Sequence, residues 1–396
     1  MPFSSNQIKY IIGDTEIIRN MEYISAFQPF DDHVLDYLDT VSKILLRNSN
    51  SKQYPDVISF SFWCRKASIK SLQKPYADIM NRIGRGVAFH IAPSNVPVNF
   101  AYSLVVGILS GNVNIVRLPS KDFEQVSLIC DALQKALDDN IKKYVCLVQY
   151  GHNQEITDYL SSICDTRIIW GGDQTIAIIR KSPLKPRAID ISFADRYSIS
   201  IIDADEYLKE INKKNIAQGF YNDTYLTDQN ACTSPRLVVW MGNNIKSAQE
   251  IFWDELHSLV KDKYLLQPIQ SVSKYSNLCK QAATNKGVHI NRGRDNYILR
   301  VKVDEIIDNL MEYKGNSGYF MEFEAGSLNE LLPLCSSQCQ TLSYYGIDPN
   351  KILDFVMTYR PRGIDRIVPI GKTMDFSLVW DGYDLIRSLS REVTIE

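Results

Sequence analysis

Residues 86–122, GVAFHIAPSNVPVNFAYSLVVGILSGNVNIVRLPSKD, hold two short apolar runs on either side of a longer apolar segment. The run GVAFHIA predicts a buried strand, and VNIVRL predicts a second one. Between them, residues 98–109 predict a helix that Ser110 and Gly111 close. A strand, a helix and a strand joined by short turns are typical of a parallel βαβ unit.

The same alternation continues along the chain. A periodic helix over 122–137 is followed by the strand YVCLVQY, a helix over 155–163 and the strand RIIW. The run AIIR at 177–180 is a candidate fifth strand. The pattern predicts an α/β fold with a doubly wound parallel sheet. Such sheets bind ligands beyond the carboxyl ends of their strands, where the loops begin at Ala92, Leu118, Tyr150 and Gly171.

The flanking regions are also patterned. Before residue 80 the chain is expected to be largely helical, with Asp31 and Asp32 capping a helix. The apolar positions of that helix have helical spacing: Val34, Leu35, Leu38, Val41 and Leu45. After the first sheet, SISII and RLVVW predict strands, and 248–260 predicts a helix. The ending REVTIE is a candidate edge strand, and an edge strand commonly pairs with a further strand or chain.

Composition excludes several classes of protein. The 396 residues carry a formal net charge of -2, so no basic field is available to bind nucleic acid. The start MPFSSNQIKY lacks the order of a signal peptide, and the most apolar stretch, 100–109, is too short to span a bilayer. Eight scattered cysteines include Cys335 and Cys339 without a histidine at metal-ligand spacing. We expect free thiols, no metal site and a cytoplasmic location.

One cysteine has an unusual setting. In DQNACTSPRLVVW, Cys232 lies among small polar residues just before an apolar strand, where a sheet can display a reactive group. A thiol with access and thiolate character can attack a carbonyl carbon. A buried, inert thiol is the alternative interpretation.

A stiff turn follows the first strand, in HIAPSNVPVNF. Pro93 and Pro97 flank Asn95, whose side-chain amide could donate to an oxyanion in acyl transfer. The alternative is an Asn that caps the next helix. His90, inside the strand, is expected to be a core residue.

Two further turns suit a nucleotide. NIVRLPSKD places Arg117, Ser120 and Lys121 at the end of the second strand, where ribose or phosphate could accept hydrogen bonds. WGGDQT places Gly171 and Gly172 before a helix N-terminus, which can bind an anion. A solvated basic turn and an ordinary strand-to-helix turn are the alternatives. No GxGxxG fingerprint is present.

Taken in order, these segments resemble the aldehyde dehydrogenase superfamily, and most closely its long-chain acyl-CoA reductases of bacterial bioluminescence operons (LuxC type). The resemblance covers residues 84–396. It is carried by these pieces: HIAPSNVP, NIVRLPSKD, NACTSPR, QTLSYYG, RGIDRIVPIG and DFSLVWDGYDLI.

The resemblance implies an aldehyde-dehydrogenase-like fold with four regions. These are a mostly helical N-terminal region (1–83), a nicotinamide cofactor domain (84–205), a catalytic α/β domain (206–372) and a C-terminal segment (373–396). It also implies an oligomer formed through a strand, for which REVTIE is the candidate.

The resemblance further assigns roles to residues. Cys232 would be the nucleophile, with Asn95 and the Cys232 backbone N–H forming the oxyanion hole. The remaining assignments concern the cofactor. A 2′-phosphate would be bound by Arg117, Ser120 and Lys121, which favours NADPH over NADH. The pyrophosphate would lie at Gly171, Gly172 and Asp173, and the nicotinamide ribose would be bound by Glu322 or Glu324.

One departure from the superfamily decides the reaction. Hydrolytic members have a glutamate that activates water, whereas ISFADRYSISII has Ser192 or a neighbour at that place and Asp190 nearby. Without that base, an acyl-enzyme would persist until a thiol or a hydride arrives. We therefore expect reduction of an acyl thioester, bound to CoA or a carrier, to an aldehyde. The acyl chain stays open, and the pathway could serve a fatty aldehyde, a modified sugar or a secondary metabolite.

Three other functions stay open. A hydrolytic aldehyde dehydrogenase would release acid from aldehyde without added thiol. A non-catalytic subunit would bind acyl groups or an acyl-activating partner enzyme. A cysteine hydrolase would need a histidine base, and the five histidines form no recognised Cys–His signature.

Overall fold

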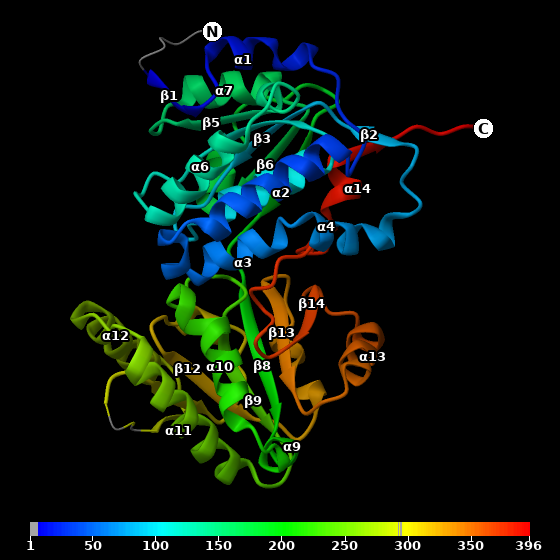
Figure 1. Ribbon diagram of the computed structural model, residues 1–396. Coiled ribbons are helices and arrows are strands. Elements are labelled where there is room, and N and C mark those ends of the chain that lie inside the picture. Colours follow the sequence, from blue (N-terminus) through cyan, green and yellow to red (C-terminus); the bar gives the residue numbers. More distant parts are fainter. Residues whose placement is uncertain (1–6, 292, 294) are drawn as a thin grey trace. The chain divides into compact units, whose positions relative to one another are not determined.

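The structure is a computed structural model that describes residues 7–291, 293 and 295–396. The first residues of the predicted N-terminal region and of MPFSSNQIKY, 1–6, lie outside them. The chain divides into two compact units. Unit 1 comprises residues 1–195 and 376–396, and unit 2 comprises residues 196–375. Each unit contains one large sheet (Figure 1).

The sheet of unit 1 has six strands, and five of them run parallel. In spatial order they are β1 (Lys9–Ile12), β5 (Val145–Gln149), β4 (Val113–Arg117), β3 (Val87–Ile91), β6 (Thr166–Trp170) and β7 (Ile189–Phe193). The edge strand β1 is antiparallel to β5. The chain winds from β3 outward to β5 and then returns to the other side of β3 at β6. Right-handed crossovers therefore place helices on both faces of the sheet, which confirms the doubly wound prediction.

Helices connect and cover these strands (Figure 1). The crossovers contain α5 (Asn99–Leu109), α6 (Glu124–Ala136), α7 (Gln154–Ile163) and α8 (Asp173–Ile179). The N-terminal region contributes α1 (Thr15–Asn20), α2 (Asp32–Arg47), α3 (Pro55–Trp63) and α4 (Lys66–Gln73). Asp31 caps α2 by accepting from the His33 backbone N–H, and the five predicted apolar positions of α2 are buried. The expectation of a largely helical N-terminal region is confirmed.

The candidate strand AIIR is wrong. Residues 177–179 belong to α8, and the fifth parallel strand is β7 instead. In α8, Ile176 and Ile179 are buried while Ile178 is about half exposed, which is helical spacing.

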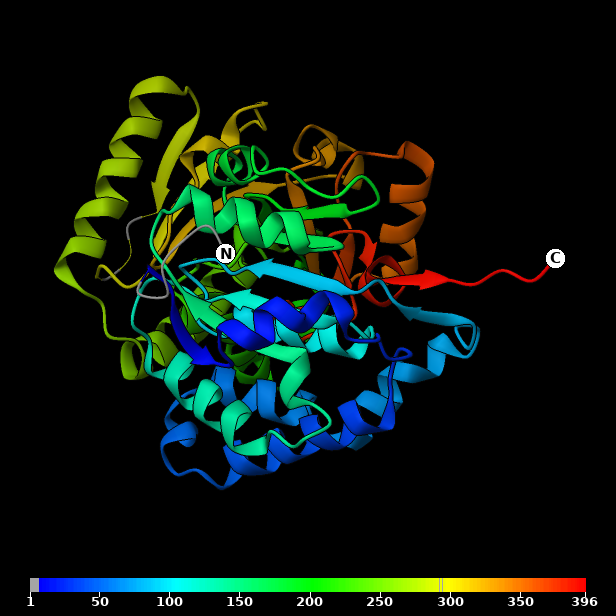
Figure 2. The ribbon, with the colours of Figure 1, turned by 90° about the horizontal axis from the view of Figure 1, so that it is seen from above.

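The C-terminal segment returns to unit 1. It forms β15 (Val379–Trp380), β16 (Tyr383–Asp384), α14 (Leu385–Leu389) and β17 (Ser390–Glu392). The last of these pairs antiparallel with β2 (Arg82–Gly84) of the same chain, and the exposed residues after it extend away from that ribbon (Figure 2). The predicted strand REVTIE thus begins as a strand, but its partner is internal. Oligomer formation stays a prediction.

Unit 2 has a seven-stranded sheet in which β10 is antiparallel and the other strands run parallel. The spatial order is β10 (Val288–Asn291), β11 (Leu299–Val303), β12 (Tyr319–Glu324), β9 (Pro235–Met241), β8 (Tyr197–Asp203), β13 (Cys339–Tyr345) and β14 (Arg366–Pro369). Its helices are α9 (Ala204–Lys209), α10 (Lys213–Thr224), α11 (Ile245–Lys263), α12 (Pro268–Thr284) and α13 (Pro349–Tyr359).

The boundaries of the units differ from the expected regions in two places. Strand β8 pairs with β9 and β13, so residues 196–205 belong to unit 2 and not to the predicted cofactor domain. Residues 376–396 join unit 1, where Leu378, Leu385 and Ile386 enter the core. Sequence pattern marks strands but does not say which sheet a strand joins.

A buried polar network lies inside unit 1 around His90 of β3. Its Nε2 lies 3.0 Å from Asn114 Oδ1, and its Nδ1 lies 2.7 Å from Ser103 Oγ, which also accepts from Trp170 Nε1. Gly107 of α5 allows this approach, because a Cβ there would lie 2.1 Å from Asn114 Oδ1. His90 is a core residue, as predicted, and burial lowers its pKa to about 4.

The network predicts acid sensitivity. Between pH 6.5 and 4 the unfolded chain binds a proton at residue 90 that the folded chain does not bind, so stability is lost as the pH falls through this window. The loss reaches about 3 kcal/mol. Urea unfolding of wild type and His90→Gln at pH 7 and pH 4.5 checks it, with exposed His289→Gln as the control. Equal pH dependence of wild type and His90→Gln would contradict it.

Candidate functional site

Cys232 lies in a loop, residues 228–234, that connects the short 3₁₀ helix η6 (Tyr225–Thr227) to β9. The loop turns sharply because Asp228 and Gln229 both adopt left-handed conformations, with φ of 51° and 53°. Ser198 Oγ, in the neighbouring strand β8, donates to the Cys232 carbonyl oxygen over 2.7 Å. The loop therefore has a defined backbone path up to and beyond the thiol.

Side-chain amides fix this loop to the turn that precedes β12. The buried Gln229 side chain donates to Pro235 O at 3.2 Å and accepts from the Gly318 backbone N–H at 2.7 Å. Asn316 Nδ2 donates to Asn230 Oδ1 over 2.7 Å. Gln229 thus joins the start of the cysteine loop to Pro235, just after its end, and Gln229 and Asn230 tie the start of the loop to one neighbouring turn.

Accessibility separates Cys232 from most of the other thiols. Cys232 is partly exposed, and Cys279 on α12 is exposed. The other six are buried free thiols: Cys64, Cys130, Cys146, Cys164, Cys335 and Cys339. Burial raises the pKa of each of these six thiols, so they are poor nucleophiles.

The predicted residues of unit 1 gather at the carboxyl edge of its sheet. Ile91 and Arg117 end adjacent parallel strands, and the register pairs Ile91 with Arg117 and with Ile169, the last residue but one of β6. The loops after β3, β4 and β6 therefore share one edge. These loops carry Asn95, Ser120, Lys121, Gly171 and Gly172.

Asn95 is exposed in the turn between β3 and α5. The N-cap of α5 is Val98, whose side chain makes no capping hydrogen bond. Asn95 lies three residues before this position, so it is not the N-cap residue, and the role of its amide in binding stays a prediction.

Arg117 is held in place by its neighbours. Its guanidinium lies 4.5 Å from the centre of the Tyr150 ring and donates to the carbonyl oxygens of Tyr150 and Gly151, at 3.4 and 3.1 Å. Ser120 and Lys121, three and four residues later, are exposed. The turn thus combines Arg117, which its neighbours anchor, with Lys121, whose exposed side chain can reach a ligand.

The glycine turn is open on one side. A Cβ at Gly172 would meet no heavy atom within 4 Å, which leaves room for a ligand. Gly172 is the N-cap of α8, and Asp173 begins that helix. The Asp173 carboxylate would repel an anion, so in this turn the backbone N–H groups are the groups suited to a pyrophosphate.

The prediction for Glu322 is wrong. Its side chain is fully buried and accepts hydrogen bonds from Trp240 Nε1 at 2.9 Å, Trp253 Nε1 at 2.7 Å and Arg300 Nε at 2.7 Å. This carboxylate compensates the partly buried guanidinium of Arg300 and, being fully buried itself, cannot reach a ribose.

The prediction for Glu324 is also wrong. Glu324 ends β12 and is paired in register with Trp240, near the end of β9, whereas Cys232 precedes the start of β9. Five residues of strand, roughly 16 Å, separate the two edges of the sheet. Glu324 is exposed and binds Lys302 at 2.8 Å.

Asp190 and Ser192 lie in the region where hydrolytic aldehyde dehydrogenases would have the water-activating glutamate. Both side chains bind other residues of this chain. Asp190 on β7 forms an ion pair with the buried Arg167. Ser192 Oγ accepts from Arg180 over 2.9 Å. Asp190 is therefore engaged in a structural ion pair, which does not suit it to act as a general base.

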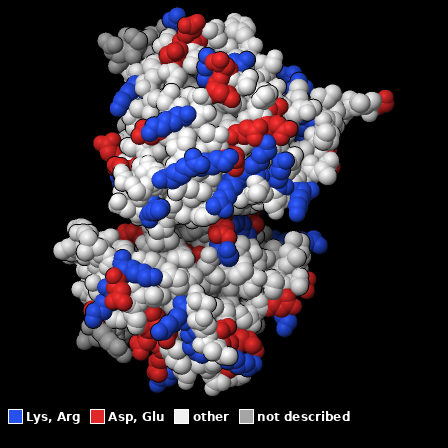
Figure 3. All heavy atoms as spheres, viewed as in Figure 1, with Lys and Arg blue, Asp and Glu red and all other residues white. Residues whose placement is uncertain are grey.

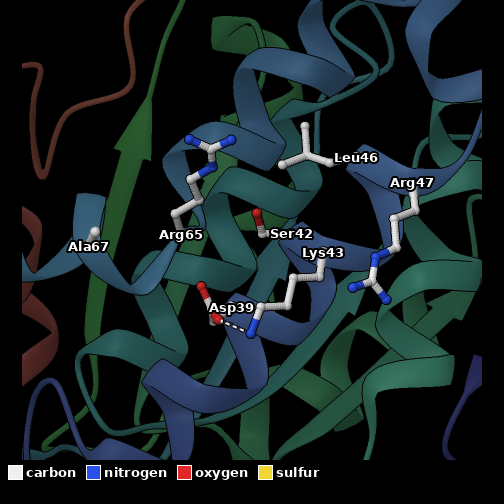
Figure 4. A pocket seen from close by; sticks show the side chains of 7 residues that line it. All are labelled: Asp39, Ser42, Lys43, Leu46, Arg47, Arg65 and Ala67. Carbon is white, nitrogen blue, oxygen red and sulfur yellow. Dashed lines mark ion pairs between the residues drawn. The ribbon is translucent and has the colours of Figure 1, made fainter.

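Sequence reasoning missed Gln229, Asn316 and Gly318, the residues that hold the cysteine loop. It also missed a groove on unit 1 of about 320 Å³ (Figure 4), lined by Asp39, Ser42, Lys43, Leu46, Arg47, Arg65 and Ala67. Lys and Arg side chains gather over this face (Figure 3), although Lys43 is paired with Asp39 at 2.6 Å. The groove contains no nucleophile suited to acyl transfer, so we do not assign the reaction to it.

In the described part of the chain, no helix has the length and apolar character that crossing a bilayer requires. Over the same residues, no three His, Cys, Asp or Glu side chains cluster as metal ligands do.

The assignment of Glu322 to the core predicts a stability effect. Glu322→Gln leaves the partly buried Arg300 charge without its counter-charge, so the free energy of unfolding of unit 2 falls by about 3 kcal/mol. Urea unfolding measures it. The control Glu324→Gln changes an exposed pair and shifts stability by about 1 kcal/mol or less. Unchanged stability of Glu322→Gln, together with weakened cofactor binding, would restore the ribose role.

Solved structures identify the fold. A benzaldehyde dehydrogenase from Corynebacterium glutamicum aligns with a TM-score of 0.66 and 11% identity, covering 99% of this chain and 95% of that one. A methylmalonate-semialdehyde dehydrogenase from Oceanimonas doudoroffii aligns with a TM-score of 0.67 and 10% identity, covering 96% and 89%. The chain therefore has the aldehyde dehydrogenase fold, as predicted.

Curated relatives are named long-chain acyl-protein thioester reductases. The one from Aliivibrio fischeri is 28% identical over 184 residues, 46% of this chain and 36% of the relative. The one from Vibrio harveyi is 23% identical over 335 residues, 78% of this chain and 63% of the relative. The chain thus matches less than two thirds of the length of either protein. The model of the acyl-CoA reductase (LuxC) family matches residues 16–282, so the chain belongs to that family.

Proposed function

We propose that this chain reduces an acyl thioester to an aldehyde through a covalent acyl intermediate on Cys232. The observation that carries the proposal is a partly exposed thiol in a loop whose start is bound to Pro235 and to the turn before β12, in a chain where six other thiols are buried. Family membership and the names of the relatives supply the reaction type.

The first half of the reaction is acyl transfer. The Cys232 thiolate attacks the thioester carbonyl carbon, a C–S bond forms, and the oxygen becomes an oxyanion. In the proposal, the Asn95 side-chain amide and the Cys232 backbone N–H stabilise that charge, and each such donor lowers the barrier by about 3 kcal/mol. The intermediate collapses when the bond to the carrier sulfur breaks and the carrier thiol leaves.

The second half releases the aldehyde. When bound, NADPH supplies a hydride to the acyl carbonyl carbon. The same two donors would hold the oxygen as negative charge returns to it. Collapse of the thiohemiacetal breaks the C–S bond to Cys232, so aldehyde leaves and the thiolate is restored. The engaged state of Asp190 supports reduction over hydrolysis, because an acyl-enzyme would not meet a ready base for water.

The carboxyl edge of unit 1 fits a dinucleotide. We propose that Lys121 and Ser120, with Arg117 behind them, bind the 2′-phosphate and favour NADPH over NADH. The open side of Gly172 would admit the pyrophosphate.

The acyl donor and the cellular setting are further proposals. A CoA or protein thiol would carry the acyl group, and an acyl-activating enzyme would be the partner that supplies it. Eight free thiols are consistent with the reducing cytoplasm. A homo-oligomer stays a proposal.

The matched pair Cys232→Ala and Cys279→Ala tests the proposal, since Cys279 is the other accessible thiol. With long-chain acyl-CoA, the rate of NADPH oxidation should fall at least a thousandfold in Cys232→Ala and stay within twofold of wild type in Cys279→Ala. Nicotinamide absorbance reports both rates. Full activity in folded Cys232→Ala, or release of free acid from aldehyde without added thiol, would refute the proposed reaction.

A further inference from the structure

Helix α12 in unit 2 has a polar inner face. Gln270, Lys274, Asn277 and Gln281 follow at intervals of four, three and four residues, which places them on one side of the helix. Ile269, Val272 and Cys279 lie exposed on the other side. Leu278 is the one apolar side chain of this helix that is buried in the core, whereas an ordinary amphipathic helix buries a whole apolar stripe, so apolar packing alone does not explain the position of the helix.

Each inner side chain binds a particular group of the loops next to it. Gln270 Nε2 donates to Asp228 Oδ2 over 3.0 Å, and Asp228 begins the cysteine loop. Asn277 Nδ2 donates to Lys314 O over 2.9 Å, and Tyr319 OH donates to Gln281 Oε1 over 2.6 Å. The helix therefore holds the segment 313–319 and the start of the cysteine loop together.

Among these inner side chains, Lys274 is the one whose burial costs the most free energy, because it carries a charge. Its side chain is 2% exposed, and among the described residues no carboxylate forms an ion pair with it. Its Nζ donates to Ser317 O at 2.7 Å and to Asn296 O. Burial lowers its pKa to about 8. A buried ammonium outside any ion pair opposes folding, even though the Asp228 and Asp295 carboxylates attract it from a distance. Its direct partners are the two carbonyl oxygens.

Ser317 lies between the two residues that hold the cysteine loop. Asn316 binds the Asn230 side chain, and the Gly318 N–H binds Gln229. Ser317 and Gly318 both have positive φ, of 60° and 85°, so this turn is an unusual conformation that depends on its partners. A shift of the Ser317 carbonyl would also move its neighbours Asn316 and Gly318. These two residues would in turn displace the loop residues that they bind, at positions 230 and 229.

We propose that Lys274 is a positioning residue for Cys232: by binding the carbonyl oxygens of residues 296 and 317, its ammonium sets the turn that holds the cysteine loop. The inference rests on the proposed function for its catalytic meaning. Lys274 acts through the turn and the loop and does not touch the substrate. A displacement of about 1 Å at a nucleophile can slow a reaction about a hundredfold, which makes such support consequential.

The test measures thiol reactivity without any substrate. Native wild type, Lys274→Met and the exposed control Lys280→Met are treated with iodoacetamide, and mass spectrometry follows alkylation of Cys232 and Cys279 separately. Cys279 is the internal reference. In Lys274→Met the rate at Cys232 should fall about tenfold while the rate at Cys279 is unchanged, and Lys280→Met should match wild type. A folded Lys274→Met that alkylates Cys232 at the wild-type rate would overturn the proposal.

A second variant covers the case in which Lys274→Met does not fold. Asn316→Ala removes the bond between the turn and Asn230 and leaves Lys274 in place, so it should give the same selective loss at Cys232. Wild-type reactivity in this variant would also overturn the proposal. In acyl-CoA reduction, both variants should lower kcat more than they change KM. Slowed alkylation of Cys232 in a protein that reduces no acyl thioester would leave the positioning role intact and refute the proposed function.

Discussion

The amide side chain of Gln229 forms the contact on which the cysteine loop depends. It binds the carbonyl oxygens of Pro235 and Tyr319 and the N–H of Gly318 while fully buried. Loss of any of these bonds would leave a buried polar group without a partner, at a cost of about 1–3 kcal/mol. The seven-residue loop therefore has little freedom, and the thiol it carries can have a fixed direction of attack.

The parallel strands of each sheet decide at which edge the candidate functional residues lie. In unit 1, the loops that could bind a dinucleotide follow the carboxyl ends of β3, β4 and β6. In unit 2, the cysteine loop and the turn before β12 precede the amino ends of neighbouring strands. Each edge collects residues that are far apart in sequence, because parallel strands all end on one side. The edge also excludes residues: Glu324 lies at the opposite end of its strand from Cys232.

The sequence predicts those features that local pattern controls. Apolar runs and turn residues located β3, β4, β5, β6 and the helices between them within about two residues. The prediction of a strand for AIIR failed because its three apolar residues satisfy helix and strand spacing equally well, and the choice depends on burial of Ile176 and Ile179 in the core. The assignment of β8 failed because pairing partners are not visible in one segment.

The same limit applies to the candidate site: local motifs are predictable from the sequence, and contacts between distant segments are not. Cys232 and the turn residues of unit 1 are recognisable because glycine, proline and polar residues interrupt apolar runs. Glu322 and Glu324 were misassigned because alternation along a strand does not show which carboxylate meets Arg300 and which meets solvent. The links from Gln229 and Asn230 to residues 316–318 join segments almost 90 residues apart, and no short motif encodes them.

The central claim is that Cys232 forms a thioester with the acyl group. The most direct measurement is intact-protein mass spectrometry after incubation with a panel of acyl-CoAs in the absence of NADPH, followed by peptide mapping. The account predicts one acyl addition per chain, located on Cys232 and removed when NADPH is added. An acyl group on Cys279 alone, or no addition with any acyl-CoA, would contradict it.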